Sequence, residues 1–220
     1  MSFSLAIFDL DGTLLDTVGD IGSAANRVLI EAGYPPHPLT AYRQFVGSGV
    51  AVLFERALPK ESANPYVIDN CISRFEREYE TCWNRDTVPY DGIGDLLDHF
   101  LSLGLRLAVL SNKPDSFAKK CVREYFTDYR FEPILGQRPD VPRKPDPTAV
   151  REIMQYHQVG AEQVFFVGDS EIDIQTAQNA GVFSIGVSWG YRPASALVDM
   201  GVDLLAEEPG DLLSFIAENT

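Results

Sequence analysis

Short apolar segments alternate with amphipathic ones through most of this chain. The apolar segments predict buried β-strands, since neither face carries a polar stripe; they are residues 4–8, 105–110, 133–135, 164–167, 182–187 and 202–206. Helical periodicity predicts helices over residues 93–103, 114–126, 147–157 and 171–180. Apolar strands that alternate with helices are typical of a parallel sheet covered on both faces. The pattern therefore predicts an α/β fold with a doubly wound, Rossmann-like core.

One long stretch interrupts the alternation. Between residues 16 and 86 the pattern is helical only, with apolar stripes over residues 18–32 and 68–82. A block of helices inserted after the first strand predicts a small α-helical cap over residues 16–86. Residues 1–15 and 87–220 are then expected to form the α/β core.

Composition restricts the classes of partner. The chain has 220 residues, 45% of them hydrophobic, and a formal net charge of −14, which would repel nucleic acids and anionic membranes. The three cysteines, Cys71, Cys82 and Cys121, lack the spacing of a metal site or disulfide framework, and we expect them to be buried. A membrane-spanning helix needs about 20 apolar residues, and no apolar run is that long. No basic segment precedes the first strand, as a signal peptide would require. We therefore expect a cytoplasmic protein, a monomer or homodimer, that binds neither nucleic acid nor membranes.

Polar residues follow the predicted strands where these end. Asp9 and Asp11 follow the first strand, Ser111 and Asn112 the second, and Asp169, Ser170 and Asp173 the fourth, while Lys144 precedes the helix that leads into the fourth. In doubly wound sheets, ligands bind outside the carboxyl ends of the strands. We therefore expect these side chains to converge at one edge of the sheet.

The residue types in this set indicate phosphate chemistry. Carboxylates gathered at one place repel one another unless they hold a cation, and a ligand set made only of oxygens suits Mg²⁺. Lys144, with the hydroxyl groups of Thr13 and Ser111, supplies the donors that a phosphoryl group requires around its oxygens. The pattern therefore predicts a Mg²⁺ site that acts on a small phosphorylated metabolite.

Four motifs in order resemble those of the haloacid-dehalogenase-like phosphatases. Residues 9–13 read DLDGT, Ser111 lies in VLSNKP, Lys144 lies in RKPDP, and residues 168–173 read GDSEID. Each motif alone is weak, but their order and their positions at strand ends make a coincidence improbable. The resemblance covers the whole chain, and the helical block matches the cap that this family inserts after the first strand.

The resemblance implies a role for each candidate residue. Asp9 would be the nucleophile that forms an aspartyl-phosphate, and Asp11 would protonate the leaving group and then take a proton from water. Asp9, Asp169 and the backbone carbonyl of Asp11 would bind Mg²⁺. The phosphate would be bound by Thr13, Ser111, Asn112 and Lys144. Asp173, with Ser170, would orient Lys144 or a metal-bound water.

The same resemblance reduces the number of possible reactions and substrates. Dehalogenases and phosphonoacetaldehyde hydrolases lack the second aspartate of the first motif, so the presence of Asp11 argues against both activities. Thr13 favours hydrolysis over phosphohexomutase activity. Residues 45–49 (FVGSG), 54–58 (FERAL) and 187–191 (VSWGY) resemble bacterial phosphoglycolate phosphatases, although PYDG at 89–92 departs from the more frequent PYPG. The first hypothesis is therefore 2-phosphoglycolate. Other sugar phosphates, a nucleotide 5′-phosphate, pyrophosphate or a broad substrate range remain open.

Within the cap, Gly47, Ser48 and Gly49 have two interpretations. They are either a simple turn between helices or a set of backbone N–H groups that binds an anion. Together with Arg56 they are the candidates to bind a substrate carboxylate. We expect Trp189 and Tyr191 to be packing residues.

A remote alternative is a receiver-like phosphorylation domain. That fold also combines a parallel sheet, an acidic metal pocket and a phosphorylated aspartate. It is shorter, however, and it has no helical insertion.

Overall fold

The computed structural model describes residues 2–219, with side chains up to residue 216. The chain forms two compact units: one ends at Leu15 and resumes at Pro89, and the other spans Asp16–Val88. The segments that join them carry the short strands β2 (Leu15–Asp16) and β3 (Val88–Pro89), which pair with each other. In the described part of the chain, every helix is too short or too polar to cross a membrane.

The first unit is built on a six-stranded parallel sheet with the order β5-β4-β1-β6-β7-β8. Its strands are β1 (Leu5–Phe8), β4 (Arg106–Pro114), β5 (Phe131–Gln137), β6 (Val164–Gly168), β7 (Phe183–Val187) and β8 (Leu204–Ala206). The order reverses at β1, with β4 and β5 on one side and β6, β7 and β8 on the other. The predicted doubly wound α/β fold is confirmed.

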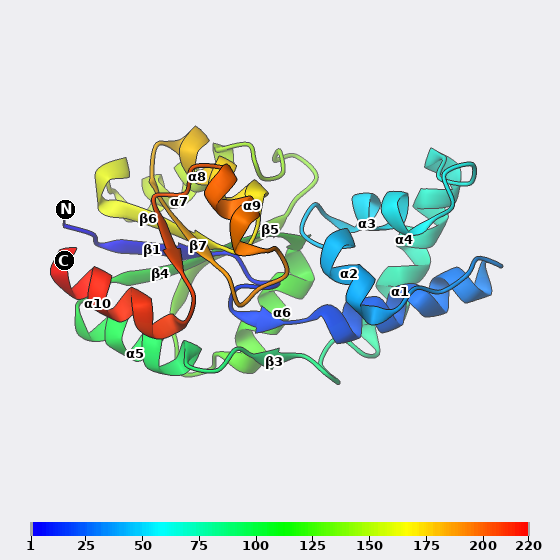
Figure 1. Ribbon diagram of the computed structural model, residues 1–220, viewed down its shortest axis with the longest axis horizontal. Helices are drawn as coiled ribbons and strands as arrows, with labels where there is room; N and C mark the ends of the chain where they lie inside the picture. Colours follow the sequence, from blue (N-terminus) through cyan, green and yellow to red (C-terminus); the bar gives the residue numbers. More distant parts are fainter. Residues whose placement is uncertain (1, 220) are drawn as a thin grey trace. The chain divides into compact units, whose positions relative to one another are not determined.

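Helices cover both faces of this sheet (Figure 1). They are α5 (Ile93–Ser102), α6 (Asp115–Tyr125), α7 (Thr148–His157), α8 (Glu171–Ala180), α9 (Ala194–Asp199) and α10 (Pro209–Asn219), with the 3-10 helix η1 (Ala161–Gln163). Leu5 of β1 packs in a cluster with Val150 of α7 on one face. On the other face, the ring of Phe8 lies 6.1 Å from that of Phe100 in α5. Because neighbouring strand residues point to opposite faces, a strand covered on both must be apolar throughout.

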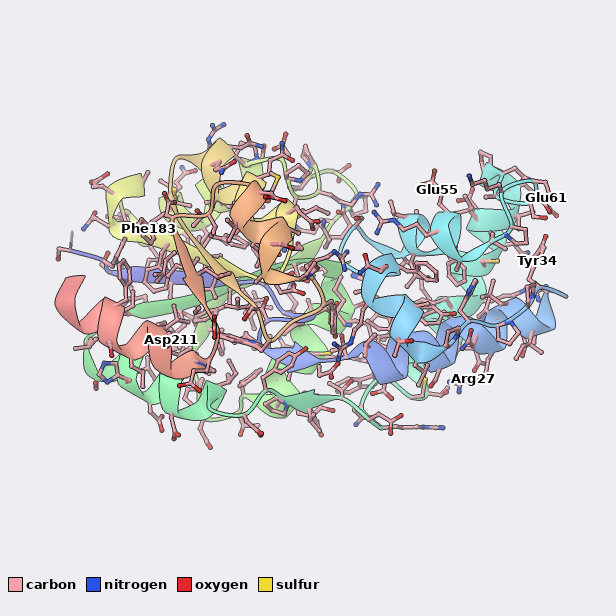
Figure 2. All side chains as sticks on the ribbon, in the orientation of Figure 1. Arg27, Tyr34, Glu55, Glu61, Phe183 and Asp211 are labelled. Carbon is pink, nitrogen blue, oxygen red and sulfur yellow. The ribbon has the colours of Figure 1, made fainter. Side chains whose placement is uncertain are left out.

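The α/β unit differs from the sequence-based expectation in the lengths of some strands and in two additional helices. β4 continues past residue 110 to Pro114, since β5 still pairs with it at the Pro114–Gln137 position. The helices α9 and α10 were not expected. The α10 helix is anchored by Phe215, whose ring stacks on Phe183 of β7 with centroids 5.3 Å apart (Figure 2 labels Phe183).

The second unit is helical, with α1 (Val18–Glu31), α2 (Leu39–Phe45), α3 (Val50–Ala57) and α4 (Pro65–Glu80). Its core is rich in aromatic residues: Tyr42, Phe54, Phe75 and Tyr79 are all buried. The rings of Phe75 and Tyr79 stack with centroids 5.2 Å apart. The three cysteines are buried and unbridged, as expected: Cys71 and Cys82 in this unit and Cys121 in the other.

The two ends of the helical unit are tied to each other through Asp20 in the first turn of α1. Its buried carboxylate accepts hydrogen bonds from the Asp86 N–H at 3.0 Å, from the Thr87 N–H at 2.9 Å and from the Thr87 hydroxyl at 2.7 Å. These bonds attach Asp86 and Thr87 to α1. The helical unit ends just beyond them, at Val88.

Candidate active site

The candidate residues of the α/β unit lie at the carboxyl ends of three neighbouring strands. Phe8 of β1 is in register with Val109 of β4 and Val167 of β6. Asp9 and Asp169 follow β1 and β6 within two residues, and Ser111 lies two residues after Val109, inside β4, at a similar level of the sheet. This is the point where the strand order reverses, at which a doubly wound sheet opens a crevice for ligands.

Lys144 is the cation at the centre of this group. Its Nζ lies 2.9 Å from Oδ1 of Asp9 and 2.7 Å from Oδ1 of Asp173, and its side chain is 1% exposed. Burial favours the neutral form, but the carboxylates of Asp173 and Asp9 outweigh it, so the pKa of Lys144 is raised. Lys144 is therefore a charged donor held directly beside Asp9.

Asp9 is buried and strongly influenced by its neighbours. Burial raises its pKa to about 6; Lys144 opposes this shift, while Asp173 and Asp11 add to it. Its hydrogen bonds with described residues fall on Oδ1, from the Leu10 N–H at 2.7 Å and from Lys144. The other carboxylate oxygen of Asp9 remains available for chemistry.

Three carboxylates at this point form a group that fits a divalent cation. Oxygens of Asp9, Asp169 and Asp173 all lie within 4.8 Å of one another. Burial, and then the charges of Asp173 and Asp9, raise the pKa of Asp169 well above its usual range. A dication would cancel this excess of negative charge, and an all-oxygen ligand set suits Mg²⁺.

The contacts of Asp173 distinguish it from the other two carboxylates. Its Oδ1 accepts the bond from Lys144, and its Oδ2 accepts from the Ser170 N–H at 3.0 Å and the Ser170 hydroxyl at 2.6 Å. Both oxygens therefore already have partners. Asp9 and Asp169 are better placed to bind a metal, while Asp173 holds Lys144.

The candidate phosphate-binding hydroxyl groups are able to donate. Oγ1 of Thr13 is buried and has no hydrogen-bond partner among the described residues; an unpaired buried hydroxyl costs about 1–3 kcal/mol, so a bound ligand would relieve that cost. Oγ of Ser111 accepts the N–H of Lys113 at 3.3 Å. The hydroxyl proton of Ser111 can therefore still be donated to a ligand.

The side chain of Asn112, a candidate phosphate ligand, forms hydrogen bonds with the backbone of Lys144. Its Nδ2 donates to the carbonyl oxygen of Lys144 at 3.2 Å, and its Oδ1 accepts the N–H of Lys144 at 3.0 Å. The Asn112 amide thus pairs with the Lys144 backbone in both directions. This pair fixes the position from which the Lys144 side chain starts.

The segment after β7 contacts the site, and the side chain of Tyr191 is buried, as expected for a packing residue. Nε1 of Trp189 donates to the carbonyl of Thr13 at 3.0 Å, and the N–H of Tyr191 donates to Oδ2 of Asp169 at 2.7 Å. A Cβ on Gly190 would lie 2.3 Å from that of Asp169, which no side chain allows. The WGY sequence resembles that of bacterial phosphoglycolate phosphatases, but it does not by itself predict these contacts.

Sequence reasoning also missed an ion pair between Lys113 and Asp11. Nζ of Lys113 lies 2.9 Å from Oδ1 of Asp11 and 3.3 Å from Oδ2. The two side chains are 3% and 9% exposed. The available signal was strand alternation, because Lys113 follows Ser111 by two residues and so starts on the same face.

In the helical unit, the three residues Gly47, Ser48 and Gly49 form the turn between α2 and α3. Both glycines have positive φ, 111° at Gly47 and 90° at Gly49, a conformation that disfavours other residues. The Arg56 guanidinium donates to the Gln44 carbonyl at 2.9 Å and to the Ser48 hydroxyl at 3.4 Å. Arg56 therefore braces this turn from α3.

Known proteins match nearly the whole chain. Residues 6–187 match the family model described as haloacid dehalogenase-like hydrolase. A phosphoglycolate phosphatase of Vibrio cholerae serotype O1 is 32% identical, over 98% of this chain and 97% of that protein. Another, from Pseudomonas putida, is 36% identical, over 87% of this chain and 73% of that protein.

Solved structures agree with these sequence matches. A candidate phosphoglycolate phosphatase from Lactobacillus delbrueckii superposes with a TM-score of 0.90 at 31% identity, covering 98% of this chain and 99% of that one. The match to the family extends over most of the sequence, and the relatives exceed 30% identity across most of their own lengths. This chain therefore belongs to the haloacid dehalogenase-like hydrolases, and within that family it is a phosphatase.

Proposed function

We propose that this phosphatase hydrolyses phosphomonoesters through an aspartyl-phosphate on Asp9. The observation that carries the proposal is the position of Lys144, whose Nζ lies between Asp9 and Asp173 in a buried site. The unpartnered Thr13 hydroxyl belongs to the same turn as Asp9. A cation and a hydroxyl donor around a carboxylate nucleophile offset its repulsion of a phosphate dianion.

Two half-reactions follow from this arrangement. In the first, an Asp9 carboxylate oxygen attacks phosphorus, the bond from phosphorus to the leaving oxygen breaks, and Asp11 gives its proton to that oxygen. In the second, water attacks the same phosphorus, Asp11 takes a proton from the water, and the bond to Asp9 breaks. With its pKa at about 6, Asp9 is mostly ionised at neutral pH and requires no base.

The residues that would hold Mg²⁺ are the carboxylates of Asp9 and Asp169 and the backbone carbonyl of Asp11. When bound, the ion supplies positive charge against the phosphoryl oxygens. The Tyr191 N–H, which donates to Asp169, fixes one of these ligands. Asp173 stays outside the ligand set and keeps Lys144 in place.

Asp11→Asn is expected to separate the two half-reactions. With p-nitrophenyl phosphate, whose leaving group needs little protonation, Asp9 should still be phosphorylated. Hydrolysis of the aspartyl-phosphate should then slow by about 10²–10⁴-fold for lack of a base. Rapid-quench kinetics should show a burst of nearly one equivalent of p-nitrophenolate, followed by slow turnover. A variant that slows both steps equally, with no burst, would contradict this role for Asp11.

For the substrate, we propose 2-phosphoglycolate, which is converted to glycolate and phosphate. Support comes from the relatives in Vibrio cholerae and Pseudomonas putida, which are named phosphoglycolate phosphatases. Phosphatases of one fold act on many substrates, so the other substrates that the sequence leaves open are tested together with 2-phosphoglycolate. A cytoplasmic location and the choice between monomer and homodimer stay predictions from the sequence.

A panel of phosphomonoesters with phosphate release as the readout tests this assignment. The kcat/KM for 2-phosphoglycolate is expected to exceed that for nucleoside monophosphates by at least about tenfold, or about 1.4 kcal/mol. An enzyme that prefers nucleotides or pyrophosphate would overturn the substrate while leaving the chemistry at Asp9 intact.

The cap turn is proposed to bind the substrate carboxylate through the backbone N–H groups of Gly47, Ser48 and Gly49. Gly49→Val should distort the turn, because φ is 90° there, and should lower kcat/KM for 2-phosphoglycolate far more than for p-nitrophenyl phosphate. Gly33→Val is the matched control. Gly33 also has a positive φ, 81°, so valine is similarly strained there, but the space around this turn is open. Equal losses for both substrates in Gly49→Val would argue against carboxylate binding at this turn.

A further inference from the structure

The ion pair between Lys113 and Asp11 has no part in the reaction as proposed so far. The Lys113 ammonium contacts both oxygens of the Asp11 carboxylate, at 2.9 and 3.3 Å. The two side chains are 3% and 9% exposed, so water can replace neither partner easily. Removing one member of such a buried pair leaves an uncompensated charge, which costs far more than breaking a surface salt bridge.

The position of Lys113 in the fold connects it to the reacting groups. It lies on the last part of β4, two residues after Ser111, and its N–H donates to the Ser111 hydroxyl. From there its side chain reaches Asp11, in the turn that follows the neighbouring strand β1. One residue thus contacts both a candidate phosphate ligand and the candidate proton donor.

We propose that Lys113 is a positioning residue that orients the Asp11 carboxyl group for its two proton transfers. A carboxylate bonded through both oxygens to one ammonium group is restricted about its side-chain torsions. Without Lys113 the carboxyl group loses this restraint on its direction toward the leaving oxygen and the attacking water. This inference rests on the proposed role of Asp11, and it predicts that Lys113 acts through Asp11 alone.

The experiment is a double-mutant cycle of Asp11→Asn and Lys113→Met, read with p-nitrophenyl phosphate by rapid quench. In Lys113→Met we expect the burst rate to stay within about threefold of the wild type, while steady-state turnover falls by about 10²-fold, the lower range for loss of a proton transfer. The double variant should match Asp11→Asn within about threefold, because a residue that acts only through Asp11 has nothing left to position. Lys113→Arg, which keeps the cation, should recover most of the turnover.

Lys119→Met is the matched control, since Lys119 also forms an ion pair, with Asp115 at 2.6 Å, but is 40% exposed. Its turnover should be unchanged, and thermal denaturation shows whether each variant is folded. Should Lys113→Met fail to fold, Lys113→Gln takes its place in the cycle.

Two results would overturn the role of Lys113. One is an additive loss in the double variant, which would mean that Lys113 contacts substrate directly. The other is an equal fall in burst and turnover, which would mean a structural role only. A different result would contradict the proposed function on which this inference rests, namely an Asp11→Asn variant that shows no burst.

Discussion

Asp9→Asn is expected to lower kcat by at least about 10⁴-fold, a loss comparable to that of other essential catalytic groups. Asparagine keeps the size of the side chain and can still accept the bonds from the Leu10 N–H and Lys144. It lacks the anionic oxygen that attacks phosphorus, however, and so no aspartyl-phosphate can form. Phosphate release at saturating substrate measures the loss, and mass spectrometry after acid quench measures the missing phosphorylated intermediate.

The control for this variant is Asp128→Asn, an equivalent change at an exposed position, which should leave kcat unchanged. Substrate binding should survive in Asp9→Asn, since Lys144 and the hydroxyl groups of Thr13 and Ser111 are intact. Residual turnover above a few per cent of the wild type would reject Asp9 as the covalent residue.

Removal of divalent cations is expected to abolish activity, and Mg²⁺ should restore it. Asp9, Asp169 and Asp173 bring three carboxylates to one buried place, and without a cation their charge would repel a phosphate dianion. Ca²⁺ should inhibit, because it prefers more ligands and longer bonds than Mg²⁺. Full activity after exhaustive chelation would refute the metal site.

The same site predicts a pH-dependent stabilisation by Mg²⁺ that needs no activity measurement. Burial raises the pKa of Asp9 to about 6, against about 3.9 in an unfolded chain. Between these values the folded protein retains a proton that the unfolded chain has lost, so the free energy of unfolding falls as the pH rises through this window.

Mg²⁺ binds the ionised carboxylates and should offset that loss of stability. The increase in Tm on adding Mg²⁺ is therefore expected to be larger at about pH 7.5 than at about pH 5, where Asp9 is mostly protonated. An increase in Tm that does not depend on pH would show that Mg²⁺ binds elsewhere.

Much of the fold follows from local patterns in the sequence. The strands β1 and β6 could be predicted because both are covered on two faces and are therefore apolar throughout. The helix α8 could be predicted to its last residue because Gly181, at φ 74°, ends it. By contrast, α9 and α10 carry no equally strong signal, and α10 depends on contacts such as that between Phe215 and Phe183.

For the candidate site, too, some features could be predicted from the sequence and others could not. By itself, the sequence determined which chemical groups the site contains and in what order they follow along the chain: Asp9, Asp11, Ser111, Lys144, Asp169 and Asp173. Their type and spacing are local properties, and parallel strands bring their carboxyl ends to one edge.

Only the tertiary structure decided which partner each residue takes. Lys113 pairs with Asp11 across 102 positions, and Trp189 bonds to Thr13 across 176. Several acceptors at this edge could satisfy either donor, and spacing along the chain does not distinguish among them. The choice depends on strand order and on side-chain direction in a buried space, where most polar groups find a partner.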